Sequence, residues 1–120
     1  MSIERPKNTK KSGLIEFFGY SSGNKFTGVC LTFDIIEEGK NPEEVMRSVE
    51  EAAILHLRTV CEKNLSDKLL NRYAPKEFWG KYFDFQKSIQ EEKLLRARLE
   101  SAKQVQYNPK SLLAMGLCFA

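Results

Sequence analysis

The chain has 120 residues, of which 42% are hydrophobic and 29% are charged, and its formal net charge is +3. This length suits one domain with its own core, and the composition excludes wholesale disorder. Cys30, Cys61 and Cys118 are widely spaced and form no CxxC pair, which predicts a reduced cytoplasmic protein without disulfides or zinc. The last apolar stretch, residues 112–120, is too short to span a bilayer, so we expect no membrane association.

Charge is distributed unevenly along the chain. Residues 1–12 carry a balance of +3, and their polar composition predicts a flexible basic arm and no signal peptide. Residues 34–51 hold seven acids against Lys40 and Arg47, a balance of −5, whereas residues 52–120 have a balance of +5. An acidic middle of this kind is typical either of a solvated surface or of a surface that faces a basic partner.

The first half of the chain predicts three strands. Residues 13–20 (GLIEFFGY) and 25–32 (KFTGVCLT) are rich in β-formers and enclose a turn with Gly23 and Asn24, which predicts a hairpin. Alternation in the second run places Phe26, Gly28, Cys30 and Thr32 on one face. Residues 33–38 (FDIIEE) form a third strand candidate, which Gly39 ends.

A long helix follows these strands. Asn41 is a preferred N-cap, Pro42 suits the first helical position, and Glu43 and Glu44 suit the positive end of the helix dipole. Apolar residues at three- and four-residue steps predict one buried stripe, which consists of Val45, Val49, Ala52, Ala53, Leu57 and Val60. The helix is expected to end at residues 63–64.

Helical patterns continue in the second half. Ser66 predicts the cap of a short helix, and Pro75 predicts the start of another that presents an aromatic cluster, interpreted mainly as a cover for the core. Residues 81–86 fit either a fourth strand or the end of that helix. Residues 86–106 predict a C-terminal helix with a thin seam at Ile89, Glu92, Leu95, Leu99 and Ala102, and residues 107–120 a tail. The predicted domain spans residues 13–85.

No catalytic residues, cofactor site or metal site are predicted. His56 and Cys61 lie on one helix but are rotated by about 140° from each other, so they cannot act as a nucleophile and its base. The acids Glu16, Asp34, Glu37 and Glu38 could gather as a metal site, although acids at strand ends usually face solvent. Phosphate contacts are conceivable for residues 5–11 and for Arg96, Arg98 and Lys103, but no DNA- or RNA-reading motif is present and specific DNA binding is not predicted.

The run FTGVCLTFDIIEEGKNPEEVMRSVEEAAILHL, residues 26–57, resembles the HicB antitoxin family, and the likeness extends over residues 13–62. The resemblance implies an α+β fold with an antiparallel β-β-β-α core, a pared-down ribonuclease H-like arrangement, followed here by C-terminal helices. It also implies docking on a small basic HicA-type toxin that cleaves messenger RNA. Residues 63–120 match neither DNA-binding domain that the family commonly carries.

These observations predict a type II antitoxin without enzymatic activity, or alternatively an orphan oligomeric scaffold with the same fold and no toxin. The acids of residues 34–51 are the candidate partner-binding residues, namely Asp34, Glu37, Glu38, Glu43 and Glu44. A thin helical seam and an exposed hairpin edge predict a homodimer or a larger homo-oligomer.

Overall fold

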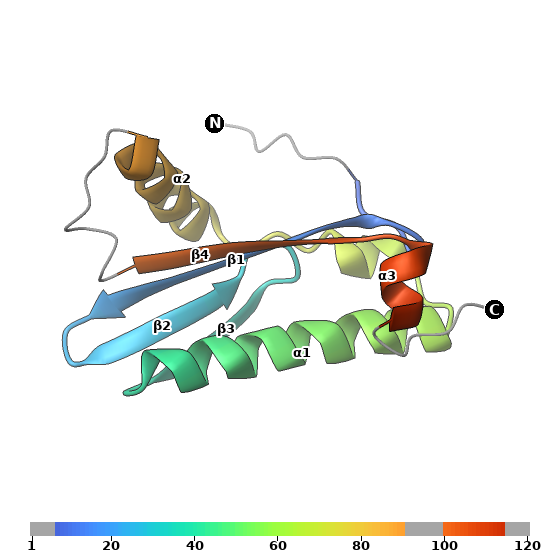
Figure 1. The fold of residues 1–120 in the computed structure, drawn as a ribbon, viewed down its shortest axis with the longest axis horizontal. Helices are drawn as coiled ribbons and strands as arrows, with labels where there is room; N and C mark the ends of the chain where they lie inside the picture. Colours follow the sequence, from blue (N-terminus) through green and yellow to red (C-terminus); the bar gives the residue numbers. More distant parts are fainter. Residues whose placement is uncertain (1–6, 91–99, 115–120) are drawn as a thin grey trace.

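The computed structural model describes residues 7–90 and 100–114, and it shows an α+β fold in which helices cover both faces of one sheet (Figure 1). The elements, in chain order, are β1 (Gly13–Ser22), β2 (Lys25–Cys30), β3 (Ile35–Gly39), α1 (Pro42–Glu62), the 3-10 helix η1 (Asp67–Leu70), α2 (Lys76–Gln90), β4 (Glu100–Tyr107) and α3 (Pro109–Ala114).

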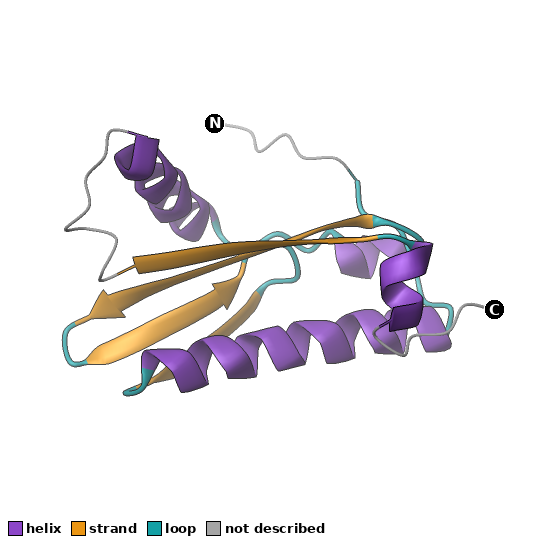
Figure 2. Cartoon of the chain, in the orientation of Figure 1, coloured by secondary structure: helices purple, strands orange, loops and turns teal. Residues whose placement is uncertain are grey.

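The four strands form an antiparallel sheet in the order β3-β2-β1-β4 (Figure 2). The β1–β2 hairpin turns at Gly23, whose φ of 65° is the left-handed conformation that glycine tolerates. β1 and β2 are central, so β3 and β4 are the two edge strands of the described sheet. Because β1 pairs with β4, the sheet joins the start of the chain to a strand beyond the predicted domain boundary at residue 85.

Each face of the sheet has its own hydrophobic cluster. On one face, Ile15, Phe17 and Cys30 pack with the buried stripe of α1, which includes Val49 and Leu57. On the opposite face, α2 covers Phe18, Val29 and Leu31 with a set of buried residues that consists of Ala74, Trp79, Tyr82 and Phe85. Figure 1 shows α1 and α2 on opposite sides of the strands. The aromatic cluster of α2 is therefore part of the core, as the sequence predicted.

The three predicted strands and α1 are present, although β2 ends at Cys30, β3 begins at Ile35, and Ala52 of the predicted stripe is only half-buried. The Asn41 side chain accepts hydrogen bonds from the Glu43 and Glu44 backbone N–H groups at 3.0 and 3.2 Å, which satisfies two donors at the helix start. The helix ends at Glu62 with Lys63 as its C-cap, and Asn64 takes a positive φ of 49° just beyond it. Ser66 caps η1, as expected.

The prediction of a helix over residues 86–106 is wrong at its C-terminal end. Residues 100–107 form β4, which pairs with β1 from Tyr20↔Glu100 to Gly13↔Tyr107. The fourth strand is therefore β4, and residues 81–86 belong to α2. Within the predicted seam, Ala102 lies on β4, whereas Glu92, Leu95 and Leu99 lie outside the described residues. Pairing with a distant strand overrides the local helical pattern here.

Parts of the predicted arm (residues 1–12) and of the predicted tail (residues 107–120) belong to the folded structure. Asn8 is 3% exposed, and its side chain binds the backbone of Leu14 and Leu70. Lys10 donates to the Leu65 carbonyl and forms an ion pair with Asp67 at 3.0 Å. Residues 1–6 lie outside the described part of the chain. At the other end, Leu112 of α3 is completely buried in the α1 cluster. Among the described residues, no helix has the length and apolar character needed to cross a membrane.

Candidate functional site

Acidic side chains line the β3 edge of the sheet. Asp34 precedes β3 and is exposed, and its φ of 57° lies in the left-handed region. Glu38 is exposed on the strand, whereas Glu37 is half-buried and accepts a hydrogen bond from Ser48 Oγ of α1 at 2.6 Å. Glu37 and Glu38 point to opposite faces, since side chains alternate along a strand. The sheet edge therefore carries carboxylates on both of its faces.

The start of α1 continues this acidic surface. Glu43 and Glu44 are exposed in the first turn of the helix, a few residues after β3 ends. Ile36 of β3 is 44% exposed, and among the residues whose burial is described only Leu55 is a more exposed large hydrophobic residue. We call the surface formed by Asp34, Ile36, Glu37, Glu38, Glu43 and Glu44 the acidic edge. It contains all five predicted partner-binding residues, spread along the edge strand and the adjoining helix turn.

The four acids considered as metal ligands do not come together. Glu16 is 2% exposed and lies under α2, on the face of the sheet opposite to α1. Glu37 lies on the α1 face, where it binds Ser48. Within the residues that the structure describes, no group of three His, Cys, Asp or Glu side chains is placed to hold a metal ion.

His56 and Cys61 have separate structural roles. The His56 ring is hydrogen-bonded through Nε2 to the Leu69 carbonyl, and its centroid lies 4.8 Å from that of Phe33. The Cys61 thiol donates to the Lys10 carbonyl at 3.6 Å. Desolvation raises the pKa of Cys61, and it raises the pKa of Cys30 to about 12. Both thiols are therefore protonated near neutral pH, which makes them poor nucleophiles.

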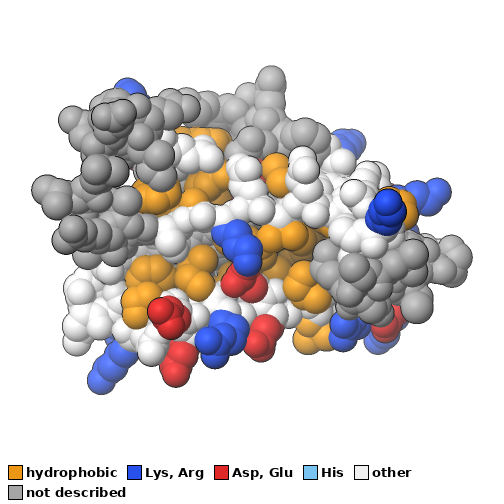
Figure 3. All heavy atoms as spheres, in the orientation of Figure 1, with side chains coloured by type: hydrophobic (Ala, Val, Ile, Leu, Met, Phe, Trp, Pro, Cys, Tyr) orange, Lys and Arg blue, Asp and Glu red, His pale blue; other side chains and the backbone are white. Residues whose placement is uncertain are grey.

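Two of the predicted phosphate contacts, Lys10 and Lys103, are engaged by other groups in the part of the chain that the structure describes. Lys10 is engaged by Asp67 and Leu65, and Lys103 of β4 forms an ion pair with Glu50 of α1. Arg5, Arg96 and Arg98 lie outside the described residues. On the outer side of α1, charges of both signs surround hydrophobic side chains (Figure 3), and Leu55 there is 59% exposed. This surface of α1 therefore differs from the basic patch that is typical of nucleic-acid binding.

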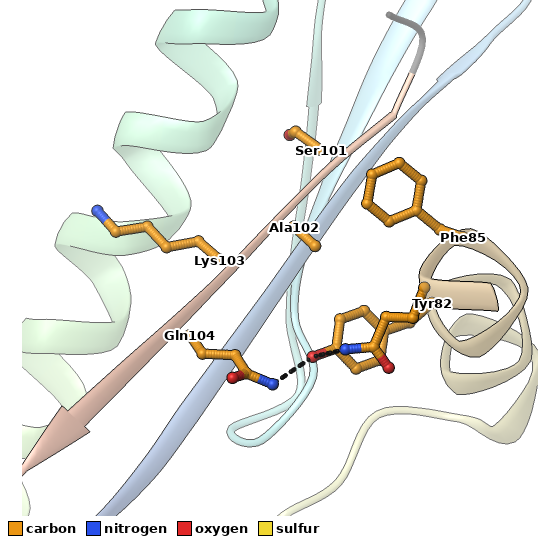
Figure 4. Close-up of a pocket in the computed structure, with 7 residues that line it drawn as sticks. Tyr82, Phe85, Ser101, Ala102, Lys103 and Gln104 are labelled. Carbon is orange, nitrogen blue, oxygen red and sulfur yellow. Dashed lines mark hydrogen bonds between the residues drawn. The ribbon is translucent and has the colours of Figure 1, made fainter. Parts of the chain in front are cut away.

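A groove of about 680 Å³ lies at the opposite edge of the sheet, between α2 and β4 (Figure 4). Its lining residues are Tyr82, Phe85, Gln86, Ser101, Ala102, Lys103 and Gln104. Sequence reasoning did not identify this groove, because its two sides come from residues that the sequence assigned to successive helices.

A hydrogen-bond network organises the polar side of the groove. The Tyr82 hydroxyl donates to Glu16 Oε2 at 2.8 Å and accepts from Gln86 and Gln104 Nε2 at 3.0 and 2.8 Å. Gln104 Nε2 also lies 3.3 Å from Glu16 Oε2. Figure 4 shows the Gln104 amide nitrogen directed at Tyr82 and its oxygen directed away. The network holds a buried carboxylate and fixes the orientation of Gln104 on β4.

Comparison with known proteins gives no match: no family model, no curated protein and no solved structure matches this chain. The geometry of the chain itself therefore has to support any functional assignment.

Proposed function

We propose that this protein is a HicB-like antitoxin of a type II toxin-antitoxin system, which neutralises a small basic HicA-type mRNA-cleaving toxin in the cytoplasm by direct binding. The observation that carries the proposal is the acidic edge, where carboxylates flank a 44% exposed isoleucine on an edge strand. The order of three antiparallel strands and a helix agrees with the core that the resemblance to HicB antitoxins implies.

The acidic edge has the parts that a surface for a basic partner needs. Its carboxylates would attract a cationic protein and accelerate encounter, mainly at low salt. Ile36 offers apolar contact, which limits dissociation once the complex has formed. β3 presents a strand edge to which an extended segment of the partner can add. The surface therefore combines steering with a place for short-range contact.

The proposal assigns no hydrolytic step to this chain. Two observations support the lack of a hydrolytic step. Glu16 and Glu37 lie on opposite faces of the sheet, and His56 is hydrogen-bonded to the Leu69 carbonyl. Raised thiol pKa values at Cys30 and Cys61 also disfavour cysteine nucleophiles. Inhibition by occlusion needs only a complementary surface, and the acidic edge supplies one.

The test uses co-expression with the product of the adjacent gene, followed by a growth assay and a pull-down. If a basic toxin is captured, its association with the chain is measured over a range of salt concentrations. Reversal of two exposed acids, Glu38→Lys with Glu43→Lys, should slow association by about tenfold at low salt and weaken its salt dependence.

The matched control is Glu62→Lys with Glu77→Lys, which changes the net charge equally through two exposed acids away from β3. This control should retain most of the association rate. Equal slowing by both pairs would show that net charge acts and that the acidic edge is not the contact. If the neighbouring product is not toxic and no basic protein is captured, the antitoxin assignment fails.

A further inference from the structure

In the described ranges 7–90 and 100–114, no strand pairs with the outer side of β4, which is an edge of the sheet. β4 pairs with β1 without interruption from Glu100 to Tyr107, so its other side presents a regular row of backbone donors and acceptors. Natural edge strands are usually protected by charges, proline or bulges. Between residues 101 and 106 the sequence has no proline and a single charged residue, Lys103, and most of these side chains are exposed.

The two edges of the sheet differ in their capacity for self-association. Antiparallel pairing of β3 with its own copy would bring Glu37 and Glu38 close to the same carboxylates of the second chain, which is unfavourable. β4 is instead dominated by neutral residues, and its charged Lys103 is already paired with Glu50. A second copy of this chain is therefore the occupant that the chemistry of β4 favours.

We propose that β4 pairs antiparallel with β4 of a second copy, across a twofold axis that passes beside Gln104, to form a dimer with one continuous sheet. This inference is independent of the proposed antitoxin function. Such an isologous contact closes on itself and does not propagate into a fibre.

Side-chain alternation and charge select this register. Opposite residues in an antiparallel pair share a face, so Ala102, Gln104 and Gln106 can oppose only one another. Centring on Lys103 would place two lysines directly opposite. Centring on Gln104 places Lys103 opposite Val105 and lets residues 101–107 pair throughout. This register is the longest that avoids the lysine clash.

The groove beside α2 accommodates the second strand. In this register, Gln106 of the second copy lies opposite Ala102, which lines the groove next to Phe85. Gln104 uses its Nε2 group for Tyr82 and Glu16, and its oxygen is directed away from them (Figure 4). Gln106 of the second copy is diagonal to Gln104, within reach of a long side chain, and can donate to that oxygen. The network thus presents an acceptor to the incoming strand.

Two experiments test this proposal together. One is light scattering of the full chain at high micromolar concentration, and the other is disulfide cross-linking. The cysteine variants Gln104→Cys, Ala102→Cys and Gln106→Cys are made in a Cys118→Ser background, since Cys30 and Cys61 are buried. Opposite residues have Cβ atoms about 4.5–5.5 Å apart, close to disulfide geometry. Two copies of residue 102 would instead be separated by four residue steps, roughly 13 Å.

We expect the wild-type chain to be a dimer and Gln104→Cys to cross-link rapidly under mild oxidation. Ala102→Cys and Gln106→Cys should cross-link at least tenfold more slowly alone and efficiently when mixed. The mixed pair leaves Gln104 intact, so it tests the register even if Gln104→Cys perturbs folding. A strict monomer would overturn the proposal, and so would rapid cross-linking of Ala102→Cys alone or no cross-linking of the mixture.

Discussion

Gly28 of β2 is the position where the packing of α1 on the sheet is most directly testable. Gly28 pairs with Gly19 on β1, and both glycines lie under the first half of α1. A Cβ atom added at Gly28 would lie 2.9 Å from Val45 Cγ1 and 3.1 Å from Val49 Cγ2. Both valines are buried, so neither has free space into which it can move. Gly28→Ala must therefore displace α1 or force Val45 and Val49 into strained rotamers.

Overpacking of this kind costs about 1–3 kcal/mol. For a domain of this size, that corresponds to a fall in the thermal midpoint of roughly 4–20 °C. Gly80→Ala is the matched control, because an added Cβ there meets no heavy atom within 4 Å and Gly80 lies inside α2. This control should stabilise the protein by about 0.5–1 kcal/mol, since alanine is the better helix former.

The assay is urea and thermal unfolding, followed by circular dichroism. A double-mutant cycle with Val45→Ala removes the nearest methyl group, and the two substitutions should couple favourably by at least about 0.5 kcal/mol. If Gly28→Ala stabilises the protein as Gly80→Ala does, or if Val45→Ala is purely additive with it, then α1 does not approach β2 as closely as the structure indicates.

The remaining predictions concern a helix cap and the buried network. Asn41→Ala should lower the free energy of unfolding by about 1 kcal/mol while Asn41→Asp retains the cap, and an unchanged thermal midpoint for the alanine variant would count against the cap. Tyr82→Phe removes the hydroxyl that donates to the Glu16 carboxylate, which is 2% exposed, and should cost about 1.5–3 kcal/mol in urea unfolding. A Tyr82→Phe variant as stable as the wild type would mean that this hydrogen bond contributes nothing to the folded state.

Local signals were sufficient for the first half of the fold. The cap at Asn41, the proline at the helix start and the apolar stripe act within a few residues of one another, so they predict α1 with nearly its observed bounds. The turn at Gly23 likewise determines the hairpin register through its own conformation. These are short-range effects that a sequence displays directly.

β4 could not be predicted in the same way. Residues 100–106 contain Ser, Ala, Lys and Gln, which have little intrinsic preference for a strand, and they follow a run of helix formers. Their conformation depends on pairing with β1, whose residues precede them by about 80 positions or more. The only local signal is the alternation of Val105 and Tyr107 toward the α1 cluster, which is too short to decide between helix and strand.

The sequence predicted which residues form the candidate site but not how the fold arranges them. The acids of the acidic edge were identified from local charge, yet their location on an edge strand depends on the order of all four strands. From the sequence, Glu16 was only a possible metal ligand among the acids near strand ends. Its burial depends on Tyr82 and Gln104, which are 66 and 88 residues away in the sequence. No pattern within one segment can reveal such a network.

The two edge strands divide the proposed interactions of this protein between opposite ends of the sheet. If β4 closes the dimer, then the strand order places both copies of β3 at the outer ends of the joined sheet, away from the twofold axis. The carboxylates that disfavour self-pairing at β3 are the same groups that favour a basic partner there. Lys103, the charged side chain near the axis, is held on the α1 face by Glu50, and in the proposed register it lies opposite Val105 of the second copy. Charge thus separates the two surfaces: each edge carries the residues that suit one occupant and discourage the other.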